Sequence, residues 1–304
     1  MDRRTFIKAG CLATELILFR SSTLHAAGTK VEKVRFGMIT DLHYADKPAR
    51  GNRFYVDTIQ KLRDAVRVFN EEKPDFVIEL GDFKDNGVNR EQTLLYLDTI
   101  ETEYRKFRGA HYHVLGNHDV DNISKSDFLK HTGNHGQAGN KTWYSFVEKN
   151  IRFIILDANH DEKGRNHENG EFDWTKPYVL PGEQLEWLSA ELGKGEPAVV
   201  FLHQLLDLTK KDKGYCVVNA RDVIDILERR GNVIAVFQGH HHAGGYLYAN
   251  GIHYYTLKGM IEGPYPTSNS FALVEIDASL NISIRGFKNC GDNFLRRRSD
   301  TYIN

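Results

Sequence analysis

Cysteine is scarce in this chain of 304 residues, with only Cys11, Cys216 and Cys290 present. So few thiols exclude a small fold stapled by several disulfides, and the chain must rely on a buried apolar core, which its length allows. The sequence does not decide whether Cys216 and Cys290 pair with each other.

Net charge is also nearly absent, because 40 lysines and arginines face 41 aspartates and glutamates. A chain without excess positive charge lacks the signature of a polyanion binder, so we expect no nucleic-acid partner. Linkers, repeats and low-complexity runs are missing from Val31 onward. We therefore expect one domain over residues 29–304. Nothing in the sequence marks an oligomeric state.

No long apolar run is present, and the most apolar stretch lies at the N-terminus, MDRRTFIKAGCLATELILFR. It is too short and too polar for a stable membrane span. Arg3 and Arg4 followed by Phe6-Ile7-Lys8 resemble a twin-arginine export signal, which we assign to residues 1–28. This resemblance implies export, to the periplasm. The alternative is an ordinary basic N-terminus on a cytoplasmic protein.

Apolar runs typical of strands alternate with segments of helical spacing through most of the chain. The expected strands lie at 34–38, 76–78, 111–115, 142–147, 151–156, 198–202 and 233–237, and the expected helices at 56–69, 94–107, 185–192 and 223–227. The last section reads as antiparallel strands, with a hairpin turn at Asn250-Gly251. This alternation predicts an α/β fold whose ligands collect at the carboxyl ends of the strands.

Histidine is abundant, with 14 residues, and three of them are consecutive at 240–242. Polar residues follow five of the expected strands within a few positions: Asp41, Asp82, Asn117, His203 and His240. Each alone fits a solvated strand end, a turn or a hydrogen-bonded core histidine. With His43 and His242 they supply two carboxylates, one amide and four imidazoles, a mixture that suits two divalent ions such as Mn, Fe or Zn.

The order of these motifs, D-x-H, G-D-x-x-D, G-N-H-D, H and G-H-x-H, resembles the calcineurin-like metallophosphoesterase superfamily from residue 34 to about 284. The resemblance implies a four-layer α-β-β-α sandwich with two mixed sheets. It also implies that one metal is held by Asp41, His43 and His242, and the other by Asn117, His203 and His240, with Asp82 bridging them. His118 would stand near the leaving group, with Asp85 orienting its ring, and His241 would not be a ligand.

The chain departs from the motifs of two subgroups of this superfamily, which narrows the set of subgroups that it resembles. Phosphoprotein phosphatases carry an arginine where Asn86 follows Asp85, and purple acid phosphatases need a tyrosine at position 85 and a glycine at position 43. Neither subgroup therefore fits the chain.

At closer range the chain resembles the manganese-dependent ADP-ribose/CDP-alcohol diphosphatase group. The segments that carry this resemblance include FGMITDLHYAD, ELGDFKDNG, GYCVVNARD and GHHHAGGYLYANGIHYYTLKGMIEG, whereas residues 159–181 are particular to this chain. It implies a small phosphorylated substrate of nucleotide type, cleaved at a phosphodiester or phosphoanhydride bond. Candidate substrate contacts beside the motifs are Tyr44, Asn86, Tyr144 and Cys216. The alternative for both tyrosines is packing against the sheet.

Two other functions compete with this hypothesis. A broad-specificity exported phosphomonoesterase would share the metal site and differ in the outer loops. A non-catalytic metal-binding protein would need neither His118 nor Asp85, so their presence favours an enzyme.

Overall fold

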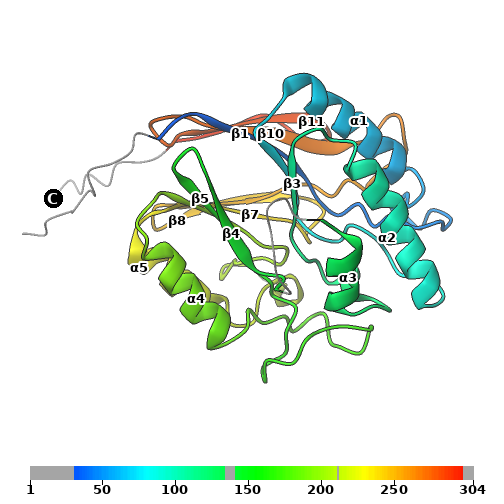
Figure 1. The fold of residues 1–304 in the computed structure, drawn as a ribbon, viewed down its shortest axis with the longest axis horizontal. Helices are drawn as coiled ribbons and strands as arrows, with labels where there is room; N and C mark the ends of the chain where they lie inside the picture. The colour runs from blue at the N-terminus through cyan, green and yellow to red at the C-terminus, as the bar shows by residue number, and fades with distance from the viewer. Residues whose placement is uncertain (1–30, 134–140, 211, 297–304) are drawn as a thin grey trace, which may run out of the picture.

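The computed structural model describes residues 31–133, 141–210 and 212–296, so the predicted export signal at 1–28 lies outside the described residues. Two six-stranded sheets dominate the fold (Figure 1), in the orders β12-β11-β10-β1-β2-β3 and β4-β5-β6-β7-β9-β8. The first contains β1 (Val34–Ile39), β2 (Phe76–Glu79), β3 (Ala110–His113), β10 (Ser270–Ile276), β11 (Ile282–Lys288) and β12 (Asn293–Leu295). The second contains β4 (Tyr144–Glu148), β5 (Ile151–Ile155), β6 (Ala198–Phe201), β7 (Val233–Gln238), β8 (Gly245–Ala249) and β9 (Ile252–Thr256).

Both sheets are mixed. Strand β1 pairs in parallel with β2 and antiparallel with β10, while β5, β6, β7 and β9 run parallel between the antiparallel edge strands β4 and β8. The hairpin predicted at Asn250-Gly251 joins β8 to β9, and both residues have the positive φ, 48° and 82°, that a tight turn of this hand requires.

Helices cover the outer face of each sheet. The helices are α1 (Thr58–Glu72), α2 (Arg90–Tyr104), α3 (Lys125–His131), α4 (Glu183–Leu192) and α5 (Ala220–Arg230), with short 3-10 turns at His118–Val120 and Lys213–Tyr215. The buried faces of α1, α2 and α3 pack on the first sheet, and those of α4 and α5 pack on the second. The predicted four-layer α/β sandwich is thus confirmed.

The sheets meet through a core of aromatic rings. Phe36 of β1 stacks on Phe76 at 5.0 Å between ring centroids, and contacts Phe201 and Phe237 of the opposite sheet edge-on at 5.7 Å. Edge-on aromatic pairs add roughly 0.5–1.5 kcal/mol beyond the burial of their area. This packing fixes the two sheets against each other and so positions the loops that leave them.

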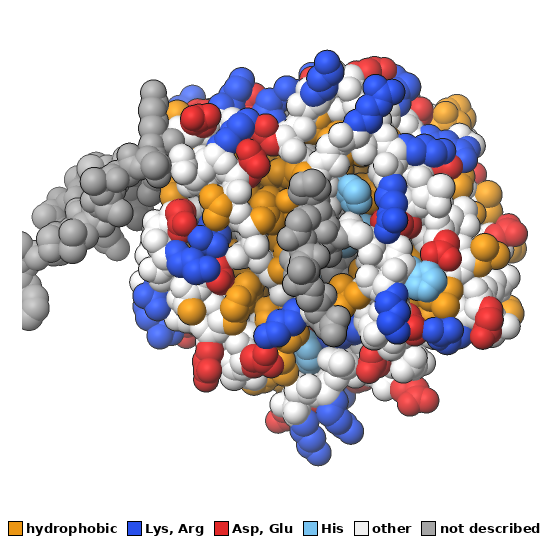
Figure 2. Space-filling model, viewed as in Figure 1, with side chains coloured by type: hydrophobic (Ala, Val, Ile, Leu, Met, Phe, Trp, Pro, Cys, Tyr) orange, Lys and Arg blue, Asp and Glu red, His pale blue; other side chains and the backbone are white. Residues whose placement is uncertain are grey.

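The remaining structural expectations are also settled. Cys216 and Cys290 are both buried free thiols, so they do not pair. No helix among the described residues has the length and apolar character needed to cross a membrane. Basic and acidic side chains are interspersed over the face in Figure 2, as expected from a chain with almost no net charge.

Candidate metal centre

The loops at the strand ends hold several site residues in an unusual backbone conformation. Asp41, His43, Asp82 and His240 have φ values of 51°, 46°, 57° and 63°, in the left-handed region that side chains other than glycine seldom adopt. Such conformations cost about 1–2 kcal/mol each and collect at functional sites. Backbone hydrogen bonds from Asp41 N to Gly81 O (3.0 Å) and from His43 N to Asp82 O (2.8 Å) hold the first two loops together.

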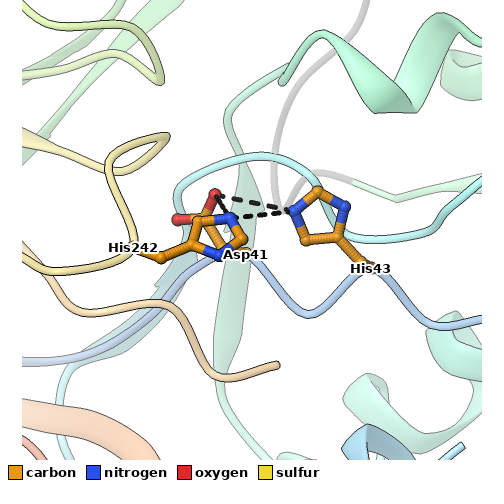
Figure 3. A group of neighbouring side chains, drawn as sticks. All are labelled: Asp41, His43 and His242. Atoms are coloured by element: carbon orange, nitrogen blue, oxygen red, sulfur yellow. Dashed lines mark hydrogen bonds and ion pairs between the residues drawn. The ribbon is translucent and has the colours of Figure 1, made fainter. Parts of the chain in front are cut away.

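Asp41, His43 and His242 form the first group of potential metal ligands, and Figure 3 shows their side chains turned toward one another. His242 Nε2 lies 3.3 Å from Asp41 Oδ1 and 3.2 Å from His43 Nε2. Two imidazole nitrogens and a carboxylate oxygen that converge in this way can share one divalent ion.

Asp82, His203 and His240 form the second group, and His118 also lies within reach of His43 and Asp82. His203 Nε2 lies 3.1 Å from Asp82 Oδ2, and its Nδ1 is 2.8 Å from the carbonyl oxygen of Leu80, which turns Nε2 into the site. Among the described residues, His240 Nε2 and Asn117 Oδ1 are buried without a hydrogen-bond partner. Buried polar atoms are normally satisfied, so these two fit a metal ion that completes the site.

Asp82 lies between the two groups. Its Oδ2 is 3.1 Å from His203 Nε2 and 3.5 Å from His43 Nε2, while its Oδ1 accepts a hydrogen bond from the backbone N–H of His118 at 2.8 Å. Six of the seven predicted metal ligands are therefore brought to one place, and the seventh, Asn117, precedes His118 in the chain and has its Oδ1 buried. The mixed nitrogen and oxygen donors fit two adjacent divalent ions with Asp82 between them.

Burial and charge set the protonation of these groups. Burial alone would raise the pKa of the Asp41 carboxyl, but His242 and His43 outweigh it and hold the pKa well below its usual range. Burial likewise opposes protonation of His203 and His242, yet nearby aspartates raise their pKa values to about 10 and about 9. Burial lowers the pKa of His240 to about 3, so the ring is neutral and has one nitrogen lone pair to offer a metal. Metal binding must therefore displace protons from part of the site.

Glu262 supports the first group from outside. Its Oε1 lies 2.7 Å from His242 Nδ1, and its Oε2 accepts a hydrogen bond from Asn52 Nδ2 at 2.6 Å. A carboxylate behind a ligating imidazole fixes the ring and its tautomer. No role was predicted for Glu262, because an acidic residue after two apolar residues is not a motif.

Lys61 of α1 holds the segment that carries Glu262. The side chain is fully buried, and its ammonium donates to a row of carbonyl oxygens: Met260 (2.9 Å), Ile261 (3.3 Å), Glu262 (3.2 Å) and Gly263 (2.6 Å). Burial lowers the pKa of Lys61 to about 8. Nothing in the helical pattern of α1 singles out this lysine, so sequence reasoning missed it.

The predicted pairing of Asp85 with His118 is wrong. The ring of His118 pairs instead with Asp121, at 2.8 Å between Nδ1 and Oδ2, because the 3-10 turn that starts at His118 brings residues three apart to the same side. Asp85 contacts Lys47 Nζ at 2.7 Å and His43 Nδ1 at 3.5 Å. Asp85 therefore contacts His43 directly and reaches His118 only through its charge, which helps to raise the pKa of His118.

The predicted substrate contacts have different outcomes. Tyr144 is buried between the sheets and donates a hydrogen bond to the carbonyl oxygen of His113, so this prediction is wrong and the packing alternative holds. Cys216 is buried with its thiol 3.4 Å from the carbonyl oxygen of Asp207. Tyr44 and Asn86 are half-buried beside the site. The contacts of Cys216, Tyr44 and Asn86 with substrate stay predictions.

Two aromatic rings flank His240 from outside the predicted set. Trp174, from the segment particular to this chain, is 46% exposed and lies edge-on to His240 at 5.9 Å between centroids. Tyr215 lies 5.5 Å from the same ring. They form an aromatic rim on the side of the second group.

Comparisons with known proteins agree with this geometry. The family model for calcineurin-like phosphoesterases matches residues 34–244. The manganese-dependent ADP-ribose/CDP-alcohol diphosphatase of Arabidopsis thaliana is 26% identical, with 79% of this chain and 90% of that protein covered, and the enzyme of the same description from Danio rerio is 28% identical, with 78% and 90% covered.

Solved structures share the fold. A dimetal phosphatase from Danio rerio has a TM-score of 0.76 at 24% identity, covering 89% of this chain and 100% of that one. A purple acid phosphatase from yellow lupin has a TM-score of 0.58 at 15% identity, covering 86% and 52%. With the family model matched over most of its length and two groups of metal ligands at its strand ends, the chain belongs to the calcineurin-like phosphoesterase family and is a metal-dependent hydrolase.

Proposed function

We propose that this enzyme hydrolyses the phosphoanhydride bond of nucleoside diphosphates linked to a sugar or an alcohol. The observation that carries the proposal is the position of Asp82 between two groups of ligands, which fits the pair of ions used in phosphoryl transfer. The choice of substrate class is supported by the relatives from plants and animals, which are described as ADP-ribose/CDP-alcohol diphosphatases.

The residues divide the work as follows. Asp41, His43 and His242 would hold one ion, and His203 and His240 with Asn117 would hold the other, with Asp82 available to both. Divalent ions bound there supply the Lewis acidity that activates water and neutralises charge on the phosphoryl group.

His118 is placed to handle the leaving group. Burial opposes its protonation, but Asp82 and Asp121 outweigh burial and raise the pKa of His118. Asp121 occupies Nδ1, so the proton available to a substrate is on Nε2, and the side chain is 30% exposed at the edge of the site. A protonated imidazole in this position can donate to the departing phosphate oxygen.

The test is turnover by manganese-loaded protein of ADP-ribose, bis-p-nitrophenyl phosphate and p-nitrophenyl phosphate, each with and without a chelator. Chelator-sensitive release of AMP from ADP-ribose supports the proposal. Cleavage of only the monoester would replace it with a general phosphomonoesterase. Absence of turnover with all three substrates would favour a non-catalytic metal-binding protein.

A pair of variants separates chemistry from metal binding. His118→Ala should keep its metal content and lose about 10²–10⁴-fold in kcat, the usual contribution of general acid catalysis. His111→Ala, at a half-buried histidine of β3 away from the site, is the matched control and should keep both. Unchanged turnover in His118→Ala would remove the acid from the mechanism.

We also propose that residues 1–28 direct export through the twin-arginine pathway, to the periplasm. The support is the Arg3-Arg4 pair followed by Phe6-Ile7-Lys8. Fractionation of cells that express the full chain should find the protein outside the cytoplasm, and the double change Arg3→Lys with Arg4→Lys should retain it inside. Arg20→Lys is the matched control. Equal localisation of all three would contradict the proposal.

A further inference from the structure

The ammonium group of Lys47 lies at the rim of the metal centre, on the side of His43. Its Nζ donates to Asp85 Oδ1 and to Asn86 Oδ1, both at 2.7 Å. Asp85 in turn faces His43 Nδ1 at 3.5 Å, on the edge of the ring opposite to the Nε2 that points at the first group of ligands. The carboxylate of Asp85 therefore lies between the Lys47 ammonium and His43, a predicted metal ligand.

The backbone fixes this placement. The segments after β1 and β2 run side by side, with hydrogen bonds from Tyr44 N to Phe83 O at 3.2 Å and from Asp85 N to Tyr44 O at 3.0 Å. Lys47 follows three residues after Tyr44, so its side chain reaches back over a short and well-anchored stretch. A cation on such a support is preorganised for a ligand.

The charge of Lys47 is only partly neutralised. An ammonium has three N–H groups, and within the described part of the chain its two acceptors are the oxygens of Asp85 and Asn86. Asp85 is shared with His43, and Asn86 is neutral. The ammonium also lies 5.7 Å from the centre of the Tyr55 ring, a weak contact, and the side chain is 33% exposed, so the third N–H group can reach a ligand.

Lys84, the neighbouring lysine, provides the contrast. It is fully buried, and its ammonium is occupied by the carbonyl oxygens of His118 and Asp121. It therefore stabilises the loop of His118 and has no opening toward a substrate. Of these two lysines, Lys47 is the one that can contact a bound anion.

We propose that Lys47 binds the phosphate of a diphosphate substrate that is not attacked, and thereby favours diphosphates over monophosphates. This rests on the proposed function of the same site. Two adjacent metal ions neutralise the phosphoryl group at which the bond breaks, whereas the second phosphate of a diphosphate brings a further negative charge to the rim. An ammonium whose third N–H group is not bound to an oxygen of the described residues is suited to that charge.

The test measures binding, so it does not depend on which bond the enzyme cleaves. The probes are α,β-methylene-ADP, a diphosphate that resists hydrolysis between its phosphorus atoms, and AMP. Their dissociation constants are measured by calorimetry on the manganese-loaded full chain, as wild type, Lys47→Met and Lys47→Arg. Lys149→Met is the matched control, because Lys149 also pairs with an aspartate, Asp75, at similar exposure.

Lys47→Met should weaken the binding of α,β-methylene-ADP by about 10–100-fold, the usual contribution of a hydrogen bond to a charged group. It should weaken the binding of AMP by less than about 3-fold. Lys47→Arg should recover part of the loss, and Lys149→Met should match wild type. An equal loss for both probes, or none for either, would overturn the proposal, since the lysine would then act through Asp85 and His43 or not at all.

Two further results separate this inference from the proposed function. The half-buried Arg53 is the other candidate cation, since it lies close enough to His242 to lower the pKa of that histidine. If Arg53→Met and not Lys47→Met selectively weakened the binding of α,β-methylene-ADP, Arg53 would be the residue that binds the second phosphate. Failure of wild type to hydrolyse ADP-ribose would remove the proposed function but leave the two binding constants, and therefore the test of Lys47, intact.

Discussion

Replacing Glu262 with glutamine should weaken one metal site and spare the other. The change keeps the size of the side chain but removes the negative charge 2.7 Å from His242 Nδ1. That charge helps to hold a donating N–H on Nδ1, so the lone pair of Nε2 faces the ion. Loss of a carboxylate behind a ligating histidine typically costs 10–100-fold in metal affinity, which is about 1.4–2.7 kcal/mol.

The structure also says which site is affected. His242 belongs with Asp41 and His43, whereas the group of Asp82, His203 and His240 has no contact with Glu262 among the described residues. Calorimetric titration of manganese into metal-free Glu262→Gln should therefore show one class of site weakened by about 10–100-fold and one changed by less than about 3-fold.

Glu183→Gln is the control, since Glu183 is exposed and pairs only with Lys141 in the described structure. Equal weakening of both metal classes, or the same titration curve as wild type, would refute the assignment of Glu262 to the support of His242.

Three further predictions concern other parts of the molecule. Asp121→Asn should lower kcat most for substrates with poor leaving groups, whereas Asp85→Asn should not change that dependence; identical profiles would contradict the pairing of His118 with Asp121. The pKa of the buried His113 is raised to about 9, against burial, by Glu101 and Glu79, so its stabilisation is complete below pH 6.5 and lost as pH rises through about 9. In urea unfolding with chelator, wild type should therefore lose up to about 3 kcal/mol more than His113→Gln between pH 6.5 and 9.5, and equal losses would contradict this. Phe36→Ala should lower the free energy of unfolding by about 3–5 kcal/mol, and a loss below about 1 kcal/mol would contradict its central place between the sheets.

Local patterns in the sequence were enough for the framework of the molecule. Apolar runs of strand length alternate with helical spacing, and this period reports burial directly, so β1, β2, β6 and β7 lie where the runs predict them. The ends of some strands differ by a residue or two from the prediction, and the strand expected at 111–115 is Ala110–His113. The helix α3 has no long apolar period and was not predicted.

The sequence was equally informative about the metal ligands. Metal ligands of this kind follow the ends of strands at fixed spacings, such as that between His240 and His242. Both features can be recognised in the sequence alone. The structure groups six of the seven predicted ligands, because they follow the carboxyl ends of parallel strands in the two facing sheets.

Only the tertiary structure decided what surrounds those ligands. Glu262 meets His242 across 20 residues, and Lys61 reaches the segment of Glu262 across about 200, so no local spacing records either contact. Asp121 displaced Asp85 as the partner of His118 because a single 3-10 turn, which depends on how the loop packs, set the direction of the ring.

The same distinction explains the substrate contacts. Tyr144 was predicted as a substrate contact, yet its strand turns it inward to the core between the sheets. Lys47 stood out by no pattern and became a candidate only when folding placed its ammonium on Asp85 and Asn86. The sequence alone therefore determined the strands, the helices and the metal-ligand motifs, because these depend on residues close together in the chain. The direction in which a side chain points depends on packing by segments far away in the sequence.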